Sequence, residues 1–236
     1  ITGRGGGTSQ AGQTVGRGLI LDFSKYMNGI LELDVAARRA VVQPGLVLDE
    51  LNRQLKPHGL WFPVDVSTAS RATIGGMCAN NSCGSRSIRY GRMRDNVHAV
   101  TALMADGSKA RFAEVPRDGP HANEAAGALT RDMLALGARE AGEIAARFPR
   151  VQRRVGGYNI DALVPDGAAN NMSHLLVGSE GTLALFESVE IALSPLPGPK
   201  ALGVCHFPTF RAAMDAAQHL VTLGPTAVEL VDRNMI

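Results

Sequence analysis

Three consecutive glycines near the start of the chain constrain its fold most strongly. Residues 3–9 read GRGGGTS and are followed by QAGQ. Because glycine has no Cβ, such a loop can adopt positive φ and turn several backbone N–H groups toward one phosphate. Thr8 and Ser9 add hydroxyl donors, and Arg4 adds a positive charge. The loop is either an anion-binding cradle or a flexible glycine segment, and other parts of the sequence are needed to distinguish these two interpretations.

Two later stretches also have the composition of backbone that lies against a ligand. Residues 67–90 are small and hydrogen-bonding, with too few large apolar side chains to form a core alone. The third stretch is the turn GSEGT at residues 178–182. Three such segments, so far apart in the sequence, indicate an extended ligand that has a diphosphate and aromatic ends.

Hydrophobic periodicity and turn residues predict a mixture of strands and helices. The predicted strands are residues 18–23, 29–34, 40–45, 97–105, 109–113, 174–178 and 183–193, and the predicted helices are 47–56 and 123–148. Asp106, Gly107 and Ser108 are typical of a hairpin turn. Residues 194–199 contain three prolines and indicate an extended connector. A strand at 201–207, a helix at 210–223 and a strand at 227–231 then predict a βαβ-like unit, which we expect to be truncated at its end.

The charge and hydropathy of the chain exclude several classes of function. Its 236 residues include 24 basic and 22 acidic side chains, a net charge of +2 that indicates no broad surface for nucleic acid. No apolar run reaches the length of a membrane span, and we expect no leader peptide, because no charged-then-apolar segment is seen. We expect a cytoplasmic protein, with peripheral attachment to the inner membrane as the alternative. Because Ile1 stands inside a motif, we expect an upstream part of the natural protein to be missing.

Cysteine and histidine spacing argues against metal and disulfide chemistry. Cys78, Cys83 and Cys205 are odd in number and lack CxxC spacing, which favours free thiols in a reducing compartment. The six histidines form no close pair, so we expect no metal site in this chain. The sequence also lacks the motifs of serine hydrolases, P-loop NTPases and Rossmann dinucleotide folds.

The roles of two aromatic residues and three arginines are interpreted from their residue types. Trp61 and Tyr158 are core aromatics or ligand contacts, and the sequence leaves both open. Arg150, Arg153 and Arg154 are interpreted as a solvated face.

Taken together, the three ligand-like stretches resemble a known family. Residues 3–9 (GRGGGTS), 73–76 (TIGG) with 79–84 (ANNSCG), and 178–183 (GSEGTL) are similar to the three FAD-binding signatures of the vanillyl-alcohol oxidase/p-cresol methylhydroxylase flavoproteins, the FAD-linked oxidases. The resemblance covers essentially the whole chain. It implies an α+β fold, with an FAD-binding domain at residues 1–196 and the beginning of a second α+β cap domain at 200–236.

Two further segments narrow the resemblance. Residues 86–91 (RSIRYG) and 154–163 (RVGGYNIDAL) resemble the D-2-hydroxyacid dehydrogenases of the long bacterial type, in which the flavin part is fused to an iron–sulfur part. This group includes D-lactate, glycolate and D-2-hydroxyglutarate dehydrogenases. An iron–sulfur cluster would belong only to a part of the natural protein outside this chain.

The resemblance also implies which residues contact FAD. Residues 4–9 would wrap the diphosphate, 65–73 and 80–83 would line the diphosphate and the flavin side, and 180–186 would lie near the adenosine. Tyr158 and Asn159 would approach the isoalloxazine. The implied cofactor-binding residues are Arg4, Gly5, Gly6, Gly7, Thr8, Ser9, Gly12, Gln13, Pro63, Asp65, Thr73, Ile74, Gly75, Gly76, Asn80, Asn81, Ser82, Gly84, Tyr158, Glu180, Gly181, Leu183 and Leu185.

The implied function is oxidation of a D-2-hydroxy acid to the 2-oxo acid, with hydride transfer to FAD and onward transfer to an electron acceptor. Members that attach flavin covalently have a histidine near the first glycine loop, and this chain has Arg4 there instead, so we predict non-covalent FAD. The family's catalytic base lies mostly in the cap domain, and the isolated chain is therefore expected to turn over poorly. An oxygen-using oxidase of alcohols or sugars, and a non-redox nucleotide-binding module, are the alternatives.

Overall fold

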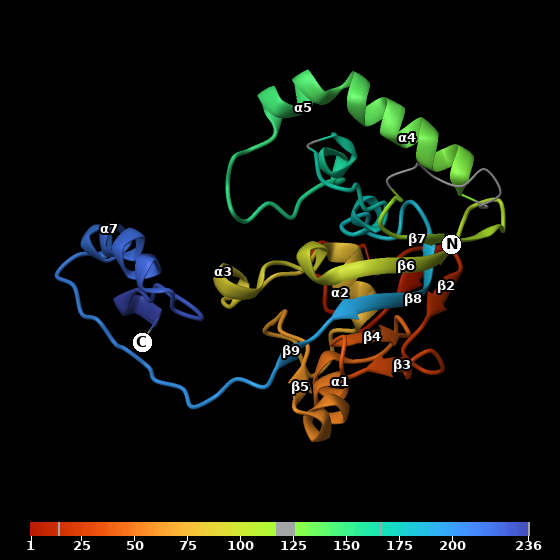
Figure 1. The fold of residues 1–236 in the computed structure, drawn as a ribbon. Coiled ribbons are helices and arrows are strands. Elements are labelled where there is room, and N and C mark those ends of the chain that lie inside the picture. The colour runs from red at the N-terminus through yellow and green to blue at the C-terminus, as the bar shows by residue number, and fades with distance from the viewer. Residues whose placement is uncertain (14, 117–125, 166, 236) are drawn as a thin grey trace.

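A five-stranded antiparallel sheet forms the centre of the fold (Figure 1). The computed structural model of the chain describes residues 1–13, 15–116, 126–165 and 167–235. The strand order is β3-β4-β8-β6-β7, which makes β8 central. The strands are β3 (Ile30–Asp34), β4 (Arg39–Val42), β6 (Val97–Leu103), β7 (Lys109–Phe112) and β8 (Leu185–Ala192). With the helices described below, this sheet confirms the predicted α+β class.

Alternating side chains explain why β8 occupies the middle of the sheet. Phe186, Val189 and Ile191 are buried, whereas the residues between them are only partly covered. Val189 and Ile191 follow the period of two that gives a strand one face for the core, whereas Phe186 lies three residues before Val189, at a register shift in the pairing with β6. β8 pairs with β4 on one side and β6 on the other, so its ladder hydrogen bonds are satisfied at both edges.

The predicted hairpin between β6 and β7 is confirmed. The carboxylate Oδ1 of Asp106 accepts a hydrogen bond from the backbone N–H of Ser108 at 2.9 Å. Gly107 has φ +84°, a conformation that glycine adopts without a Cβ clash. The turn therefore forms for the reason that its residue types indicate.

Helix α1 (Leu48–Leu55) confirms the helix predicted at 47–56. Leu48, Leu51 and Leu55 are buried on one face, as their spacing predicts. The 3-10 turn η1 (Lys56–His58) ends the helix, and β5 (Leu60–Trp61) pairs antiparallel with β9 (Ser194–Pro195). The proline-rich connector therefore begins as a short strand on the body of the fold.

The short strands and helices in the N-terminal half of the chain include those that line the candidate functional site. β1 (Thr2–Arg4) pairs in parallel with β2 (Ile20–Asp22). Helix α2 (Ile74–Asn80) contacts β8, and its Ile74, Met77 and Cys78 are buried in the core. The small-residue stretch thus contributes to the core after all, but through one helical face only. Helix α3 (Ser87–Tyr90) and the 3-10 turn η2 (Arg94–Asn96) follow it.

Two helices cover another side of the fold (Figure 1). α4 (Gly127–Arg139) and α5 (Ala141–Arg147) confirm the helical prediction for 123–148, of which residues 123–125 lie outside the described residues. α4 packs closely on the 3-10 turn η3 (Ile160–Leu163), because Gly137 leaves room for the carbonyl group of Leu163.

The strand predicted at 174–178 is wrong. Residues Ser173–Leu176 form the short helix α6 instead. The Oδ1 atom of Asn171 accepts hydrogen bonds from the backbone N–H of Ser173 (2.9 Å) and from its hydroxyl (2.7 Å). This local side-chain contact turns the chain into a helix. A short apolar run by itself does not distinguish a strand from a buried helical turn.

The C-terminal βαβ prediction is correct only for its helix. α7 (Phe210–Leu220) and the 3-10 turn η4 (Val221–Leu223) form, followed by η5 (Arg233–Met235). Residues 201–207 and 227–231 are not strands, because neither run finds a hydrogen-bonding partner among the described residues. Leu202 is 90% exposed, and α7 lies apart from the sheet at the end of an extended segment (Figure 1).

Free thiols are confirmed for Cys78, Cys83 and Cys205. Among the described residues, no helix is long and apolar enough to cross a membrane.

Candidate functional site

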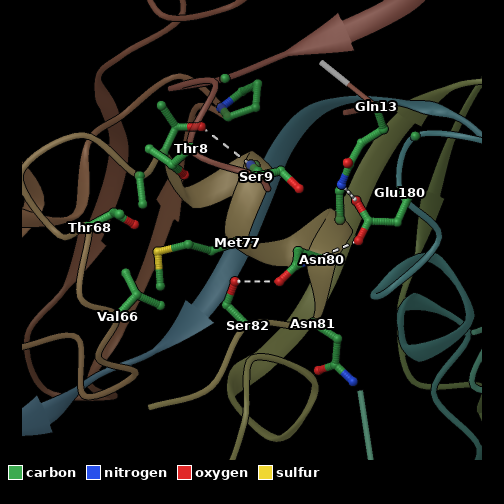
Figure 2. Close-up of a pocket in the computed structure, with 18 of the residues that line it drawn as sticks. Thr8, Ser9, Gln13, Val66, Thr68, Met77, Asn80, Asn81, Ser82 and Glu180 are labelled. Carbon is green, nitrogen blue, oxygen red and sulfur yellow. Dashed lines mark hydrogen bonds between the residues drawn. The ribbon is translucent and has the colours of Figure 1, made fainter. Parts of the chain in front are cut away.

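The three glycine- and serine-rich stretches meet at one cavity of about 730 Å³ (Figure 2). Its walls come from β1 and the loop after it, from the segment before α2, from α2 itself, and from the turn that leads into β8. A volume of this size is typical of a site for a cofactor or other organic ligand. The fold thus brings together segments that lie far apart in the sequence.

Most of the residues that the family resemblance implies line this cavity. They are Arg4, Gly5, Thr8, Ser9, Gln13, Asp65, Thr73, Gly75, Gly76, Asn80, Asn81, Ser82, Gly84, Glu180, Gly181 and Leu185. The structure does not place the following among the lining residues: Gly6, Gly7, Gly12, Pro63, Ile74, Tyr158 and Leu183. Of these, Ile74 and Pro63 are buried in the protein, and Leu183 packs against the core.

The glycine loop lies directly against the backbone that precedes α2. A Cβ on Gly5 would overlap the hydroxyl of Thr73, and a Cβ on Gly6 would overlap the carbonyl oxygen of Arg71. Only Gly7 and Gly12 in this loop have positive φ, at +64° and +81°. The glycines therefore serve close packing of one chain segment on another as well as loop conformation.

Helix α2 is held at its start by a side-chain cap and by a close contact. The hydroxyl of Thr73 accepts a hydrogen bond from the N–H of Gly76 at 3.3 Å. A Cβ on Gly75 would overlap Pro44, so this glycine lets the helix approach the end of β4. The far end of α2 then carries Asn80 and Asn81 to the cavity.

Asp65 lines the cavity, but its carboxylate accepts hydrogen bonds from other residues of the protein. Its Oδ2 accepts from the Ser85 hydroxyl at 3.1 Å, and its Oδ1 accepts from the Arg86 backbone N–H at 3.2 Å. Gly84 has no room for a Cβ against this residue. Asp65 therefore shapes the wall formed by residues 84–86.

Glu180 connects all three stretches (Figure 2). Its Oε2 accepts a hydrogen bond from Gln13 Nε2 at 3.2 Å, and its Oε1 accepts one from Asn80 Nδ2 at 2.6 Å. Its backbone N–H donates to the carbonyl of Ala79 at 2.9 Å. One residue of the third stretch thus contacts the first loop and the end of α2.

Two buried polar atoms beside the cavity lack protein partners. Asn81 is fully buried, and although its Oδ1 accepts from the Arg94 N–H at 3.0 Å, its Nδ2 has no partner among the described residues. The same holds for Oε1 of Gln13. A buried donor or acceptor without a partner is costly, and a bound polar ligand is one way to satisfy it. The polar lining and the glycine cradle fit a large polar cofactor such as FAD.

Tyr158 and Asn159 do not reach the cavity as the resemblance implies. Tyr158 is 46% exposed, and its hydroxyl lies 2.7 Å from the hydroxyl of Thr182. Asn159 is buried and donates through Nδ2 to the carbonyl of Val177 at 2.8 Å. The Tyr158 hydroxyl thus contacts the third stretch, and the Asn159 amide contacts the residue just before it. In the segment 154–163, Val155 is the residue that lines the cavity.

Arg154 is not part of a solvated face. It forms an ion pair with Asp161 and stacks over the ring of Phe148, with its guanidinium carbon 4.6 Å from the ring centroid. Arg94 binds the same carboxylate at 2.8 Å. Burial raises the pKa of Asp161, but the hydrogen bonds and charge of Arg94 and Arg154 outweigh it and hold that pKa below its usual value.

His174 lies beside this ion-pair cluster and is kept neutral. Burial lowers the pKa of His174 to about 4, and the positive charge of Arg94 contributes to the shift. Burial likewise raises the pKa of Cys78, which therefore stays a thiol. Neither group lines the cavity.

Several lining residues were not among the cofactor-binding residues that the resemblance implies. They are Thr2, Gln10, Phe23, Pro44, Met77, Ala79, Ser85, Val155 and Glu229. Most are ordinary residues next to a motif, and only their position in the fold brings them to the cavity. For Phe23 and Pro44, the ends of the predicted strands at 18–23 and 40–45 were the available signal.

A known protein family matches the N-terminal part of the chain. Residues 1–112 match the family described as FAD binding domain. This match confirms the predicted resemblance to the FAD-linked oxidases, with FAD as the cofactor.

Individual relatives narrow the comparison. The chain is 33% identical to D-2-hydroxyglutarate dehydrogenase of Pseudomonas putida over 242 residues, which is 100% of this chain and 24% of that protein. It is 30% identical to the enzyme of that name from Escherichia coli, again over 24% of it. It is 29% identical to the mitochondrial D-lactate dehydrogenase [cytochrome] of Arabidopsis thaliana, over 98% of this chain and 33% of that protein. The chain thus spans about a quarter to a third of the length of these relatives.

Among solved structures, alkyldihydroxyacetonephosphate synthase has a similar fold. The TM-score is 0.60 at 21% identity, and the match covers 96% of this chain and 33% of that one. At this identity the likeness concerns the fold alone.

Proposed function

We propose that this chain is the flavin-binding part of an FAD-dependent dehydrogenase that oxidises a D-2-hydroxy acid to the 2-oxo acid. D-lactate, glycolate and D-2-hydroxyglutarate are the candidate substrates, and the electron acceptor is a separate partner. The names of the relatives with about 30% identity support this substrate class. In this proposal, residues 1–196 form the FAD-binding domain and residues 200–236 begin a cap domain.

One observation carries the proposal: three sequence segments with the composition of cofactor-binding backbone line a single cavity of about 730 Å³. A flexible glycine segment would not pack its glycines against the Arg71 carbonyl and the Thr73 hydroxyl. The unpartnered Nδ2 of Asn81 and Oε1 of Gln13 also favour a polar occupant.

In the proposed complex, the protein binds and orients the cofactor. Arg4, Thr8 and Ser9 supply a positive charge and hydroxyl donors for the diphosphate, and Asn81 supplies a buried amide donor. FAD itself supplies the chemistry, by accepting the hydride from the substrate carbon. Attachment is proposed to be non-covalent, because the first glycine loop carries Arg4 and no histidine.

A direct test begins with the cofactor. Purified protein is incubated with FAD, freed of excess by gel filtration and examined by absorption spectroscopy. We expect a flavin spectrum at a stoichiometry near one, released intact by acid because no covalent bond holds it. Protein that stays colourless would favour the non-redox nucleotide-binding module.

The substrate class needs the full-length protein. A panel of D- and L-2-hydroxy acids is tested anaerobically with an artificial electron acceptor, and we expect turnover with D-enantiomers or glycolate only. Rapid reoxidation of the reduced flavin by air would instead support an oxygen-using oxidase.

The proposed location is the cytoplasm, with peripheral attachment to the inner membrane as the alternative. Cell fractionation tests this location.

A further inference from the structure

We infer that Glu180 is a positioning residue that ties the three cavity-lining stretches together before the cofactor binds. The inference rests on the proposed function, since it concerns how the same cavity is prepared for FAD. Its basis is the pair of hydrogen bonds that one carboxylate accepts, from Gln13 at 3.2 Å and from Asn80 at 2.6 Å (Figure 2). Gln13 is 167 residues away in the sequence, and Asn80 is 100 residues away.

The amide of Asn80 is oriented for this contact. The hydroxyl of Ser82 donates to Asn80 Oδ1 at 3.2 Å, which leaves Nδ2 facing Glu180 (Figure 2). Hydrogen bonds to a carboxylate are stronger than those between neutral groups. The chain of contacts therefore runs from Ser82 through Asn80 to Glu180 and on to Gln13, along the rim of the cavity.

The backbone at Glu180 supports a special role for its side chain. Its φ is +52°, a region that residues with a Cβ rarely adopt. The neighbouring Gly178 and Gly181 also have positive φ, at +87° and +74°. Glycine would suit position 180 better on conformational grounds alone. A glutamate there indicates that the contacts of its carboxylate outweigh the backbone strain.

Charge argues against a role for Glu180 as a direct ligand of the diphosphate. An ionised carboxylate only accepts hydrogen bonds, and it repels an anionic group. Both of its oxygens already accept from amide groups of the protein. A tether between two amides is therefore the role that suits a carboxylate beside an anion site.

Three variants separate the tether from the backbone conformation. Glu180→Gly removes the carboxylate. It also relieves the backbone strain of a residue with a Cβ at positive φ, so loss of folding is not expected. Glu180→Gln keeps an acceptor for Asn80, and after a flip of the Gln13 amide its new N–H group can donate to Gln13 Oε1, which has no partner among the described residues. Gln13→Ala removes one arm only. Glu143→Gln, an exposed carboxylate on α5, is the matched control.

Hydrogen exchange of the cofactor-free protein measures the tether itself. In Glu180→Gly we expect faster exchange of backbone amides in residues 5–13, while amides of the central strand β8 keep their protection. Exchange in Glu180→Gln and in the Glu143 control is expected to match the unmodified protein. Unchanged exchange of residues 5–13 in Glu180→Gly would overturn the inference.

Measurements of FAD binding then test whether these hydrogen bonds of Glu180 affect cofactor affinity. The FAD dissociation constant should rise about three- to tenfold in Glu180→Gly, since the lost hydrogen bonds lie at an exposed rim. Glu180→Gln should stay within about twofold of the unmodified protein. Equal loss of affinity in both variants, with normal exchange of residues 5–13, would make Glu180 a direct ligand and overturn the positioning role. If the unmodified protein binds no FAD, the proposed function fails, while the exchange experiment still tests the tether.

Discussion

The carbonyl oxygen of Arg71 occupies the space where a side chain on Gly6 would have to lie. This relationship changes the meaning of the glycine triplet. Gly6 is not among the residues that line the cavity, so its lack of a side chain serves the contact with the segment before α2. The cradle keeps its shape because two segments of backbone are in direct contact.

Gly6→Val is therefore expected to displace the loop from Arg71 and to abolish FAD binding. The forced separation should also lower the free energy of unfolding by about 1–3 kcal/mol, as overpacking does elsewhere. Urea unfolding and FAD titration measure the two effects. Gly16→Ala is the control, since no described atom lies within 4 Å of its Cβ position. A Gly6→Val protein that keeps both flavin and stability would contradict the described packing.

Asp65→Ala should loosen the wall at residues 84–86, because the carboxylate accepts hydrogen bonds from Ser85 and Arg86. We expect a loss of about 1–3 kcal/mol in unfolding free energy from the unsatisfied groups, together with weaker FAD binding. Urea unfolding and flavin titration again serve as measurements. Asp215→Asn, in an exposed pair of α7, should change neither quantity. Weaker flavin binding without a stability change would mean that Asp65 contacts the cofactor directly.

Protonation of His174 should destabilise the protein in acid. Burial lowers its folded-state pKa to about 4, whereas the unfolded value is about 6.5. The unfolded chain therefore binds more protons between these values, so this contribution to stability is complete above pH 6.5 and is lost as pH falls toward 4. Its full size is on the order of 3 kcal/mol. Unfolding free energies of the unmodified protein and His174→Gln, measured from pH 7.5 to 4.5, should differ in slope only below about pH 6.5. Parallel curves would refute the assignment.

Asp161→Asn should be among the more damaging polar substitutions. It removes the charge that Arg94 and Arg154 share, and leaves two partly buried guanidinium groups without their partner. We expect about 2–4 kcal/mol of destabilisation in urea, near the range seen when one partner of a buried pair is lost. Because Arg94 also donates its backbone N–H to Asn81, flavin affinity should fall as well. A change below about 0.5 kcal/mol would show that solvent already screens the cluster.

Much of the site was predictable because glycine and small polar residues leave a visible pattern. The glycine loop, residues 73–84 and the turn at 178–182 all meet at the cavity, as the resemblance implies. Their individual roles were not predictable. The engagement of Asp65 with Ser85 and the contact of Gly6 with Arg71 depend on segments that only the folded chain brings together.

The difference between local patterns and long-range contacts also explains which elements of the fold were predicted wrongly. Helix α1 and the β6–β7 hairpin follow from local patterns, and both were predicted. The helix at Ser173–Leu176 depends on the Asn171 side chain, which a hydrophobic pattern does not represent. The strands expected at 201–207 and 227–231 would need pairing partners, and propensity alone does not supply these.

The position of β8 in the sheet has a thermodynamic consequence. The cavity-lining turn at Gly181 leads directly into this central strand, which pairs with both β4 and β6. Occupancy of the cavity and integrity of the sheet are therefore linked equilibria. A ligand that binds only the folded form stabilises it by an amount that grows with the logarithm of its concentration. Added FAD should thus raise the midpoint of thermal unfolding, and it should slow amide exchange in strands that never contact it.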